Sequence, residues 1–477
     1  MADGLALRSP RGRGVLVATV LASGMAFLDG TVVNVALPTL GRELGASMSG
    51  LQWVVDAYLL TLSALLLLGG SLGDVLGRKR MFLAGTVAFA ATSALCGLAP
   101  SLPFLAVTRA LQGAAAALLV PGSLAILKSS IRREDQDAAV GAWAGLSGVT
   151  TAAGPLLGGW LVEALSWRAI FFLNLPLALA AASAGNRCVR TEQRAARTAL
   201  DWTGGALAAI CLAGLVFALI EGPAHGWPLG ASLSGALGLA ALAAFVAWER
   251  RAPEPMLPLS LFRRRQFAAV NLTTLTLYFG LSGALFLVVL GLQHGLGYGP
   301  LGSSLALLPI SAIMLVLSPL AGRLARAIGY RAPMTVGPVC AGAGLALIAW
   351  IGLSGRGLAS LAPGVMLFSL GLGLTVAPLT SAAMTGVEDR DAGIATAVNN
   401  AVARVAGLLG VAVLPGLGGV SVAMSGEPFL RSVRAALFAA AAVCVAGGLV
   451  ALVGVPSRRA LAGEGALPSR GPGQGPT

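Results

Sequence analysis

The chain has 477 residues, of which 56% are hydrophobic and only 11% are charged. A soluble domain carries about 25% charged residues to cover its surface, so this composition excludes a water-soluble fold. A net charge of +13 could indicate nucleic-acid binding, but the basic residues stand in short clusters between apolar runs and form no single patch. The composition therefore predicts an all-α polytopic membrane protein that is surrounded by the lipid bilayer and has no nucleic-acid partner.

Apolar runs long enough to cross a bilayer occur fourteen times in the chain. We expect spans near residues 15–37, 52–70, 81–99, 104–127, 138–163, 168–187, 202–220, 229–248, 267–290, 303–322, 333–352, 361–385, 392–418 and 434–454. The first run follows a cluster of arginines, as a signal peptide does. It continues to Pro38 without a clear cleavage site, so we interpret it as a span.

The basic residues support this topology, because positively charged loops stay in the cytoplasm. With both termini cytoplasmic, 25 of the 32 Lys and Arg residues fall in cytoplasmic segments. The opposite loops hold only Arg42, Arg168, Arg356, Arg431 and Arg434. Arg is far more frequent than Lys, which is typical of GC-rich bacterial coding sequences. We therefore expect a multi-pass protein of the bacterial cytoplasmic membrane.

Two loops indicate an internal repeat. After span 2 the glycines Gly70 and Gly77 stand seven residues apart, and Gly322 and Gly329 do so after span 10, each pair with basic residues close behind. If each loop joins the second and third helices of a six-helix half, the halves are parallel repeats and spans 7 and 8 are an inserted pair. This predicts a cytoplasmic tail at 1–14, an N-terminal half at 15–190, linkers and inserted helices at 191–265, a C-terminal half at 266–455 and a disordered cytoplasmic tail at 456–477.

Four charged residues stand well inside the spans, namely Asp29, Asp56, Arg109 and Arg404. Each costs about 2.5–3.5 kcal/mol on insertion scales and is therefore a functional candidate. Asp29 is the first candidate for proton coupling, because apolar surroundings disfavour its charged form unless a cation offsets them. Asp56 is the second candidate, although it could instead lie hydrated at the membrane surface. Arg109 stays ionised and needs a partner, either Asp29 or Asp56, and the pair could also be purely structural.

The loop after span 2 contains a possible latch. Asp74 and Arg78 are four residues apart and could pair on a helical turn between Gly70 and Gly77. The alternative is a cluster of basic residues that only sets the membrane topology, but the positive-inside rule does not explain the acid Asp74 at this place. We therefore interpret these four residues as a cytoplasmic latch that can be made and broken.

Span 5 carries a close-packed and bendable sequence. Small residues allow helices to approach each other closely, and a proline removes a backbone hydrogen bond. The residues predicted to form a hinge in this helix are Gly154, Pro155, Gly158 and Gly159. Other polar residues within the spans are candidates for the wall of a cavity, and they are Asn34, Gln112, Asn399, Asn400 and Arg404.

Enzyme chemistry is not indicated. No catalytic set is apparent, and the two histidines, His225 and His294, are far apart in the sequence with nothing nearby to complete a metal site. The phosphate-binding pattern GxxxxGK[ST] is missing, and the five cysteines are few and scattered. We expect no metal and no cofactor, with a proton gradient as the energy source.

Several of these strings occur together in one known family. They are residues 28–38, 70–80, 109–113, 154–159 and 167–176, together with Asn399, Asn400, Arg404 and Gly407. In this order, and on these spans, the chain resembles the major facilitator superfamily, and within it the fourteen-helix drug:proton antiporters of the EmrB/QacA type. The resemblance covers the chain from about residue 15 to residue 453.

The resemblance implies a major facilitator fold that exports hydrophobic or amphipathic drugs or natural products in exchange for protons by alternating access. It implies proton coupling by Asp29 and Arg109, a latch at Asp74 and Arg78, and a hinge in span 5. No acid lies deep in spans 9–14, which favours neutral, amphipathic or monocationic cargo over dications. We expect a monomer. The alternatives are a metabolite carrier or importer of the same superfamily, and a membrane-embedded enzyme or sensor.

Overall fold

The computed structural model describes residues 4–190, 201–253, 255–385 and 392–457. The N-terminal half contains α1 (Pro10–Leu44), α2 (Met48–Leu76), α3 (Arg78–Gly97), α4 (Leu102–Ser130), α5 (Arg133–Ala164), α6 (Ala169–Phe172) and α7 (Asn174–Cys188). The inserted pair is α8 (Trp202–His225) and α9 (Leu229–Glu249). The C-terminal half contains α10 (Arg265–Leu290), α11 (Pro300–Ile328), α12 (Arg331–Leu347), α13 (Ala362–Met384), α14 (Ala392–Gly418) and α15 (Gly426–Gly454). The linker 191–200 and most of the predicted tail, residues 458–477, lie outside the described part of the chain.

The helices confirm the fourteen predicted spans. Thirteen helical segments in the described residues are long and apolar enough to cross a membrane, with α6 and α7 counted as one span. The remaining span is α5, whose glycines lower its mean hydropathy. Its 32 residues reach ~48 Å at 1.5 Å per residue, which is more than the hydrocarbon core requires. The described residues form no β-strand beyond one isolated bridge between Leu5 and Ile131.

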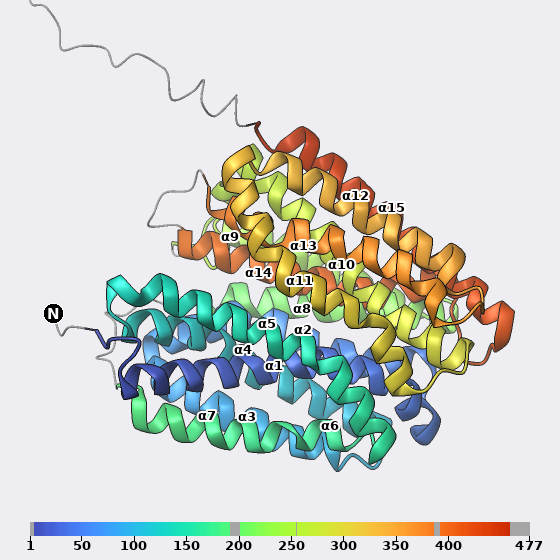
Figure 1. Cartoon of the computed structure of the whole chain (residues 1–477), viewed down its shortest axis with the longest axis horizontal. Helices are drawn as coiled ribbons and strands as arrows, with labels where there is room; N and C mark the ends of the chain where they lie inside the picture. Colours follow the sequence, from blue (N-terminus) through green and yellow to red (C-terminus); the bar gives the residue numbers. More distant parts are fainter. Residues whose placement is uncertain (1–3, 191–200, 254, 386–391, 458–477) are drawn as a thin grey trace, which may run out of the picture.

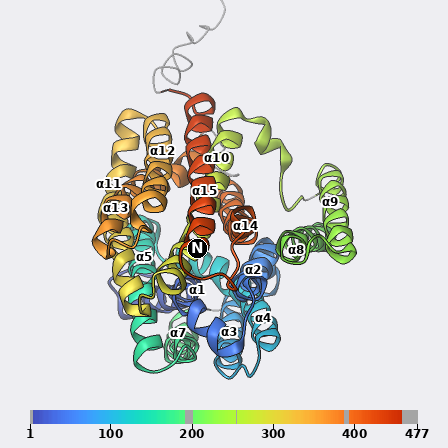
Figure 2. The same ribbon diagram turned by 90° about the vertical axis from the view of Figure 1, so that its right-hand side faces the viewer.

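The two halves form two helical bundles, and the inserted pair lies beside them (Figure 1, Figure 2). In Figure 2, α8 lies against α2, and α9 is the outermost helix. Trp53 of α2 donates a hydrogen bond from Nε1 to Oε1 of Glu221 in α8 at 2.7 Å. Helix α8 also packs on α14 of the other half, through a small cluster that includes Val216 and Leu408.

The two glycine-containing loops of the predicted repeat have similar backbone geometry. Gly77 ends α2 with φ 103°, and Gly329 ends α11 with φ 95°. The two glycines terminate corresponding helices of the two halves, in a conformation that residues with a Cβ atom rarely adopt. Each donates its backbone N–H to a carbonyl four residues earlier, Gly73 and Ala325 respectively. This correspondence supports the assignment of α2 and α11 as equivalent helices.

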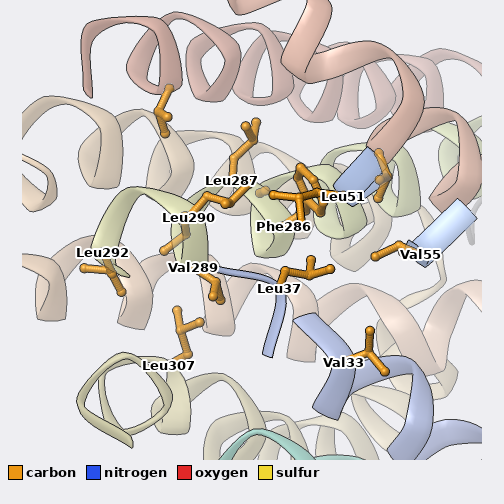
Figure 3. Packing of buried hydrophobic residues seen from close by; sticks show 14 of the residues in the cluster. Val33, Leu37, Leu51, Val55, Phe286, Leu287, Val289, Leu290, Leu292 and Leu307 are labelled. Atoms are coloured by element: carbon orange, nitrogen blue, oxygen red, sulfur yellow. The ribbon is translucent and has the colours of Figure 1, made fainter. Parts of the chain in front are cut away.

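The two ends of the molecule are packed differently. We call the end at which α1 begins the near end, and the end at which α1 finishes the far end. At the far end one hydrophobic cluster joins both halves, and we call this cluster the far-end seal. Figure 3 shows part of it, with Val33, Leu37, Leu51, Val55, Phe286, Leu287, Val289, Leu290, Leu292 and Leu307 labelled.

At the near end the buried hydrophobic residues separate into clusters that each belong to one half. The N-terminal cluster includes Val15, Phe82 and Ile131, whereas a C-terminal cluster includes Met334 and Leu379. The bundles accordingly diverge toward the side of the N-terminus in Figure 1. The two halves therefore share one buried hydrophobic cluster at the far end, whereas their buried clusters are separate at the near end.

Candidate functional site

Asp29 and Arg109 form a buried ion pair inside the N-terminal half. Asp29 lies at the middle of α1, and Arg109 lies on α4, which packs against α1 and α2. Asp29 Oδ2 is 2.5 Å from Arg109 Nη1, and the side chains are 0% and 1% exposed. Of the two partners that the sequence left open for Arg109, the structure selects Asp29.

Two amide side chains complete the surroundings of the Asp29 carboxylate. Gln112 donates from Nε2 to Asp29 Oδ1 at 2.9 Å, and Asn174 of α7 donates to the same oxygen at 3.2 Å. Gln112 Oε1 also accepts a hydrogen bond from Arg109 Nη1 at 2.7 Å. The carboxylate thus has three donors, which is how a buried charge is normally compensated.

The Arg109 guanidinium has further partners that hold it in place. Its Nε donates to the carbonyl oxygen of Val54 in α2 at 3.0 Å. The guanidinium carbon lies 4.3 Å from the centre of the Tyr58 ring and 5.9 Å from that of Phe171. Cation–π contacts of this kind add about 0.5–2 kcal/mol each. The ion pair therefore connects four helices of one half and can respond to a movement of any of them.

Asp56 is isolated. Its side chain is fully buried, and neither carboxylate oxygen forms a hydrogen bond with any described residue. The interpretation of Asp56 as a hydrated surface residue is therefore wrong for this conformation. An unpaired acid in such surroundings costs several kcal/mol, so Asp56 remains a functional candidate.

The predicted latch residues come together at the near end. Arg78 Nε donates to Asp74 Oδ1 at 2.9 Å, and both side chains are partly exposed. Gly77 lies between the two helices that carry them, at the backbone turn described above, and Gly70 stands two turns earlier near Pro121 of α4. The contact is within reach of solvent, so it can open and close at low cost.

The glycines of α5 allow close approach to two different helices. Gly154 lies against Thr31 and Gly158 against Val32, both of α1. Gly159 faces α11, where a Cβ atom would lie 2.6 Å from Ser304 Oγ and 2.9 Å from Leu301 Cα. Pro155 lies inside the helix between these contacts. The motif thus forms part of the contact between the halves at the far end.

The predicted cavity residues lie in different places. Asn399 is buried within the C-terminal half, where it donates to Asn271 and Thr274 of α10 at 3.2 and 2.7 Å. Gln112 is fully buried beside Asp29. These two residues do not line an open space in this conformation, because their side chains are used inside their own halves.

The other three cavity candidates are more accessible. Asn400 is exposed and Arg404 is half-buried, one helical turn apart on α14. Asn34 is half-buried on α1, and its Nδ2 donates to Gly30 O at 3.2 Å.

Sequence reasoning missed the polar contacts that cross the far-end seal. Gln293 donates to the carbonyl oxygen of Val35 at 3.0 Å, and Gln52 donates to that of Val411 at 2.8 Å. The backbone N–H of Leu301 donates to Glu163 Oε2 at 3.1 Å. The only available signal was an amide within an apolar run, which predicts no particular partner.

Within the described ranges, no group of three or more His, Cys, Asp or Glu residues is placed to hold a metal ion. What the arrangement provides is a buried acid that is paired with one arginine and hydrogen-bonded by two amides, next to the far-end seal. This is the architecture of a carrier that exposes its interior to one side at a time.

Comparison with known proteins identifies the family. The family model of the Major Facilitator Superfamily matches residues 19–411, and the chain belongs to this superfamily. It is 36% identical to the probable actinorhodin transporter of Streptomyces coelicolor, over 82% of this chain and 69% of that protein. It is 35% identical to the multidrug resistance protein Stp of Mycobacterium tuberculosis, over 87% and 78% of the two chains.

A further relative is the tetracenomycin C resistance and export protein of Streptomyces glaucescens, with 36% identity over 84% of this chain and 74% of that protein. Among solved structures, a peptide transporter of the POT family in complex with sulfate superposes with a TM-score of 0.71 at 16% identity, covering 94% of this chain and 96% of the other. At this level of identity the similarity concerns the fold alone.

Proposed function

We propose that this protein is a proton-coupled antiporter of the bacterial cytoplasmic membrane that exports hydrophobic or amphipathic drugs or natural products. The relatives named as antibiotic exporters and multidrug resistance proteins support the class of cargo. The clustering of basic residues supports a cytoplasmic near end with both termini inside. In this orientation the structure is inward-facing, and the far-end seal closes the outer side.

The observation that carries the proposal is the Asp29–Arg109 pair. In this conformation Asp29 is fully enclosed and accepts hydrogen bonds from Arg109, Gln112 and Asn174. A proton arriving from outside would neutralise Asp29 and release Arg109 from its only described acidic partner. Because the pair connects α1, α2, α4 and α7, this change alters the packing of the half that must tilt.

The driving force is sufficient for concentrative export. One elementary charge crossing the membrane is worth about 2.3 kcal/mol per 100 mV. A proton-motive force of about 150 mV therefore supplies roughly 3.5 kcal/mol per proton, which corresponds to about a 300-fold cargo gradient. One proton per cycle, exchanged at one carboxylate, accounts for efflux without any cofactor.

The test is efflux of lipophilic dyes from whole cells, measured with and without a proton uncoupler. We expect the uncoupler to abolish efflux by the wild-type protein and Asp29→Asn to lose coupled efflux at normal membrane abundance. The matched control is Asp137→Asn, since Asp137 is an exposed acid at the start of α5. Efflux that ignores the uncoupler, or full activity of Asp29→Asn, would contradict the proposal.

A further inference from the structure

Open space borders α1 at the level of the ion pair. A Cβ atom added to Gly30 would have no neighbour within 4 Å, in contrast to most glycines of the helical core. Phe27 and Asn34 stand on the same face of α1, three residues before and four residues after Gly30, and both are half-buried. This face of α1 therefore lines a space rather than a helix–helix contact.

Arg404 of α14 lies across this space. Its guanidinium carbon is 5.4 Å from the centre of the Phe27 ring, and Asn400 is exposed one turn away on the same face of α14. Ala401, between them, packs against the hydrophobic cluster of the N-terminal half. The opposite face of α14 is occupied, because Asn399 hydrogen-bonds to α10. Asn400 and Arg404 therefore face the other half.

The charge of Arg404 is not compensated within the described residues, where it forms neither an ion pair nor a hydrogen bond. Neither of the two acids on neighbouring helices forms an ion pair with Arg404. Asp29 is held by Arg109, and Asp56 is fully buried with both oxygens unpartnered. The accessible charge between the halves is thus positive. An unpaired arginine at this depth of a membrane protein is costly and marks a place where an anion would be stabilised.

Aromatic surface accompanies the positive charge. Phe27 lies on the α1 side beside the Arg404 guanidinium, and Tyr278 is half-buried on α10. A planar guanidinium can form two parallel hydrogen bonds to a carboxylate while its face stays on an aromatic ring. The residues present therefore fit a ligand that combines an acidic group with a flat apolar body.

We propose that Arg404 selects cargo by charge and that the preferred cargo is an aromatic molecule with an ionised acidic group, either a carboxylate or a phenolate. The inference rests on the proposed export function and narrows it. The inference departs from the expectation of neutral or monocationic cargo. That expectation rested on the absence of acids in the C-terminal half and did not take the positive charge of Arg404 into account. Arg404 adds a positive group that repels a monocation.

A consequence concerns the membrane potential. For one proton per cycle, export of a monoanion moves two elementary charges inward, whereas export of a neutral molecule moves one and that of a monocation moves none. Transport of an anionic probe should therefore respond more steeply to an imposed potential than transport of a cationic probe on the same aromatic skeleton.

The test uses two xanthene dyes, fluorescein as the anion and rhodamine 6G as the cation. Binding to the purified protein is measured first by fluorescence polarisation, and transport is then measured in proteoliposomes. We expect the wild-type protein to bind fluorescein at least tenfold more tightly than rhodamine 6G. Arg404→Gln should remove this preference, and Arg404→Lys, which keeps the charge, should retain most of it.

One further variant, compared with Arg404→Gln, separates the possible failures. Gly30→Phe fills the open space beside α1 and should weaken binding of both dyes, whereas Arg404→Gln should leave rhodamine 6G binding unchanged or stronger. The inference is overturned if the wild-type protein shows no preference for fluorescein, or if Arg404→Gln weakens both dyes equally. The proposal of proton coupling is tested separately. If the charge preference is present but an uncoupler does not affect transport, the inference about cargo stands and proton coupling is contradicted.

Discussion

The contact of α5 with α11 provides a direct test of the far-end seal. Replacing Gly159 with alanine places a Cβ atom 2.6 Å from Ser304 Oγ, 2.9 Å from Leu301 Cα and 2.9 Å from the Pro300 carbonyl oxygen. Two of these three neighbours are backbone atoms at the start of a long helix and cannot move aside alone. The two helices must therefore separate, which opens the contact between the halves.

The size of the effect follows from the cost of overpacking. An extra methyl group in a closely packed contact costs about 1–3 kcal/mol. The contact with Ser304 and Leu301 joins the two halves at the closed end, so this cost falls on the inward-facing state. The equilibrium should therefore shift toward the outward-facing state by about 5- to 150-fold.

The assay is labelling of a cysteine introduced at Val289 with a membrane-impermeant maleimide, in a background without the five native cysteines. Val289 is 2% exposed within the seal, so labelling reports opening. Gly159→Ala should raise the labelling rate several-fold. The matched control is Gly145→Ala on the same helix, since a Cβ at Gly145 meets no atom within 4 Å. Equal rates for Gly159→Ala and the parent, or equal opening by both variants, would refute the reasoning.

Three further predictions concern contacts outside the ion pair. Glu163→Ala removes the acceptor of the Leu301 N–H. It should raise labelling of the cysteine at Val289 about two- to fivefold, because a hydrogen bond of this kind contributes about 0.5–1 kcal/mol. Glu163→Gln still offers an acceptor oxygen and should leave the labelling rate unchanged. Asp74→Asn weakens the 2.9 Å contact with Arg78 and should leave dye binding unchanged while slowing turnover; unchanged turnover would exclude the latch. Asp135 accepts hydrogen bonds from Arg132 and from the Leu7 N–H, which hold the pKa of its carboxyl group below the ordinary value. This contact is present at neutral pH and is lost as the pH falls. Asp135→Asn should therefore release the segment before α1 and speed tryptic cleavage after the exposed Arg8 at neutral pH, and an unchanged cleavage rate would contradict this role.

The spans and the repeat could be predicted from the sequence, because both depend on local properties. Each span is a contiguous apolar run, and Gly77 and Gly329 end equivalent helices because only glycine readily adopts their positive φ. The sequence also indicated that Arg109 needs an acidic partner, because few charged residues lie within the spans, but it left Asp29 and Asp56 both open.

The remaining features depend on contacts between distant segments. Gln293 and Val35 are 258 residues apart, and Gln52 and Val411 are 359 residues apart. An uncharged amide carries a smaller insertion cost than an acid, so the sequence did not mark Gln52, Gln293 or Asn174 as functional. Gln112 was assigned to a cavity because it is a polar residue within an apolar span. Its orientation toward Asp29 depends on how α1 and α4 cross, which the sequence does not indicate.

The most direct test of the account compares two transport modes of Asp29→Asn in proteoliposomes at equal amounts of monodisperse protein. Counterflow of cargo at equal pH requires only movement of the two halves, whereas accumulation driven by a pH gradient also requires proton exchange. We predict that Asp29→Asn retains counterflow and loses accumulation driven by the pH gradient. Accumulation at the wild-type level in this variant would show that the proton moves elsewhere and would contradict the assignment of Asp29.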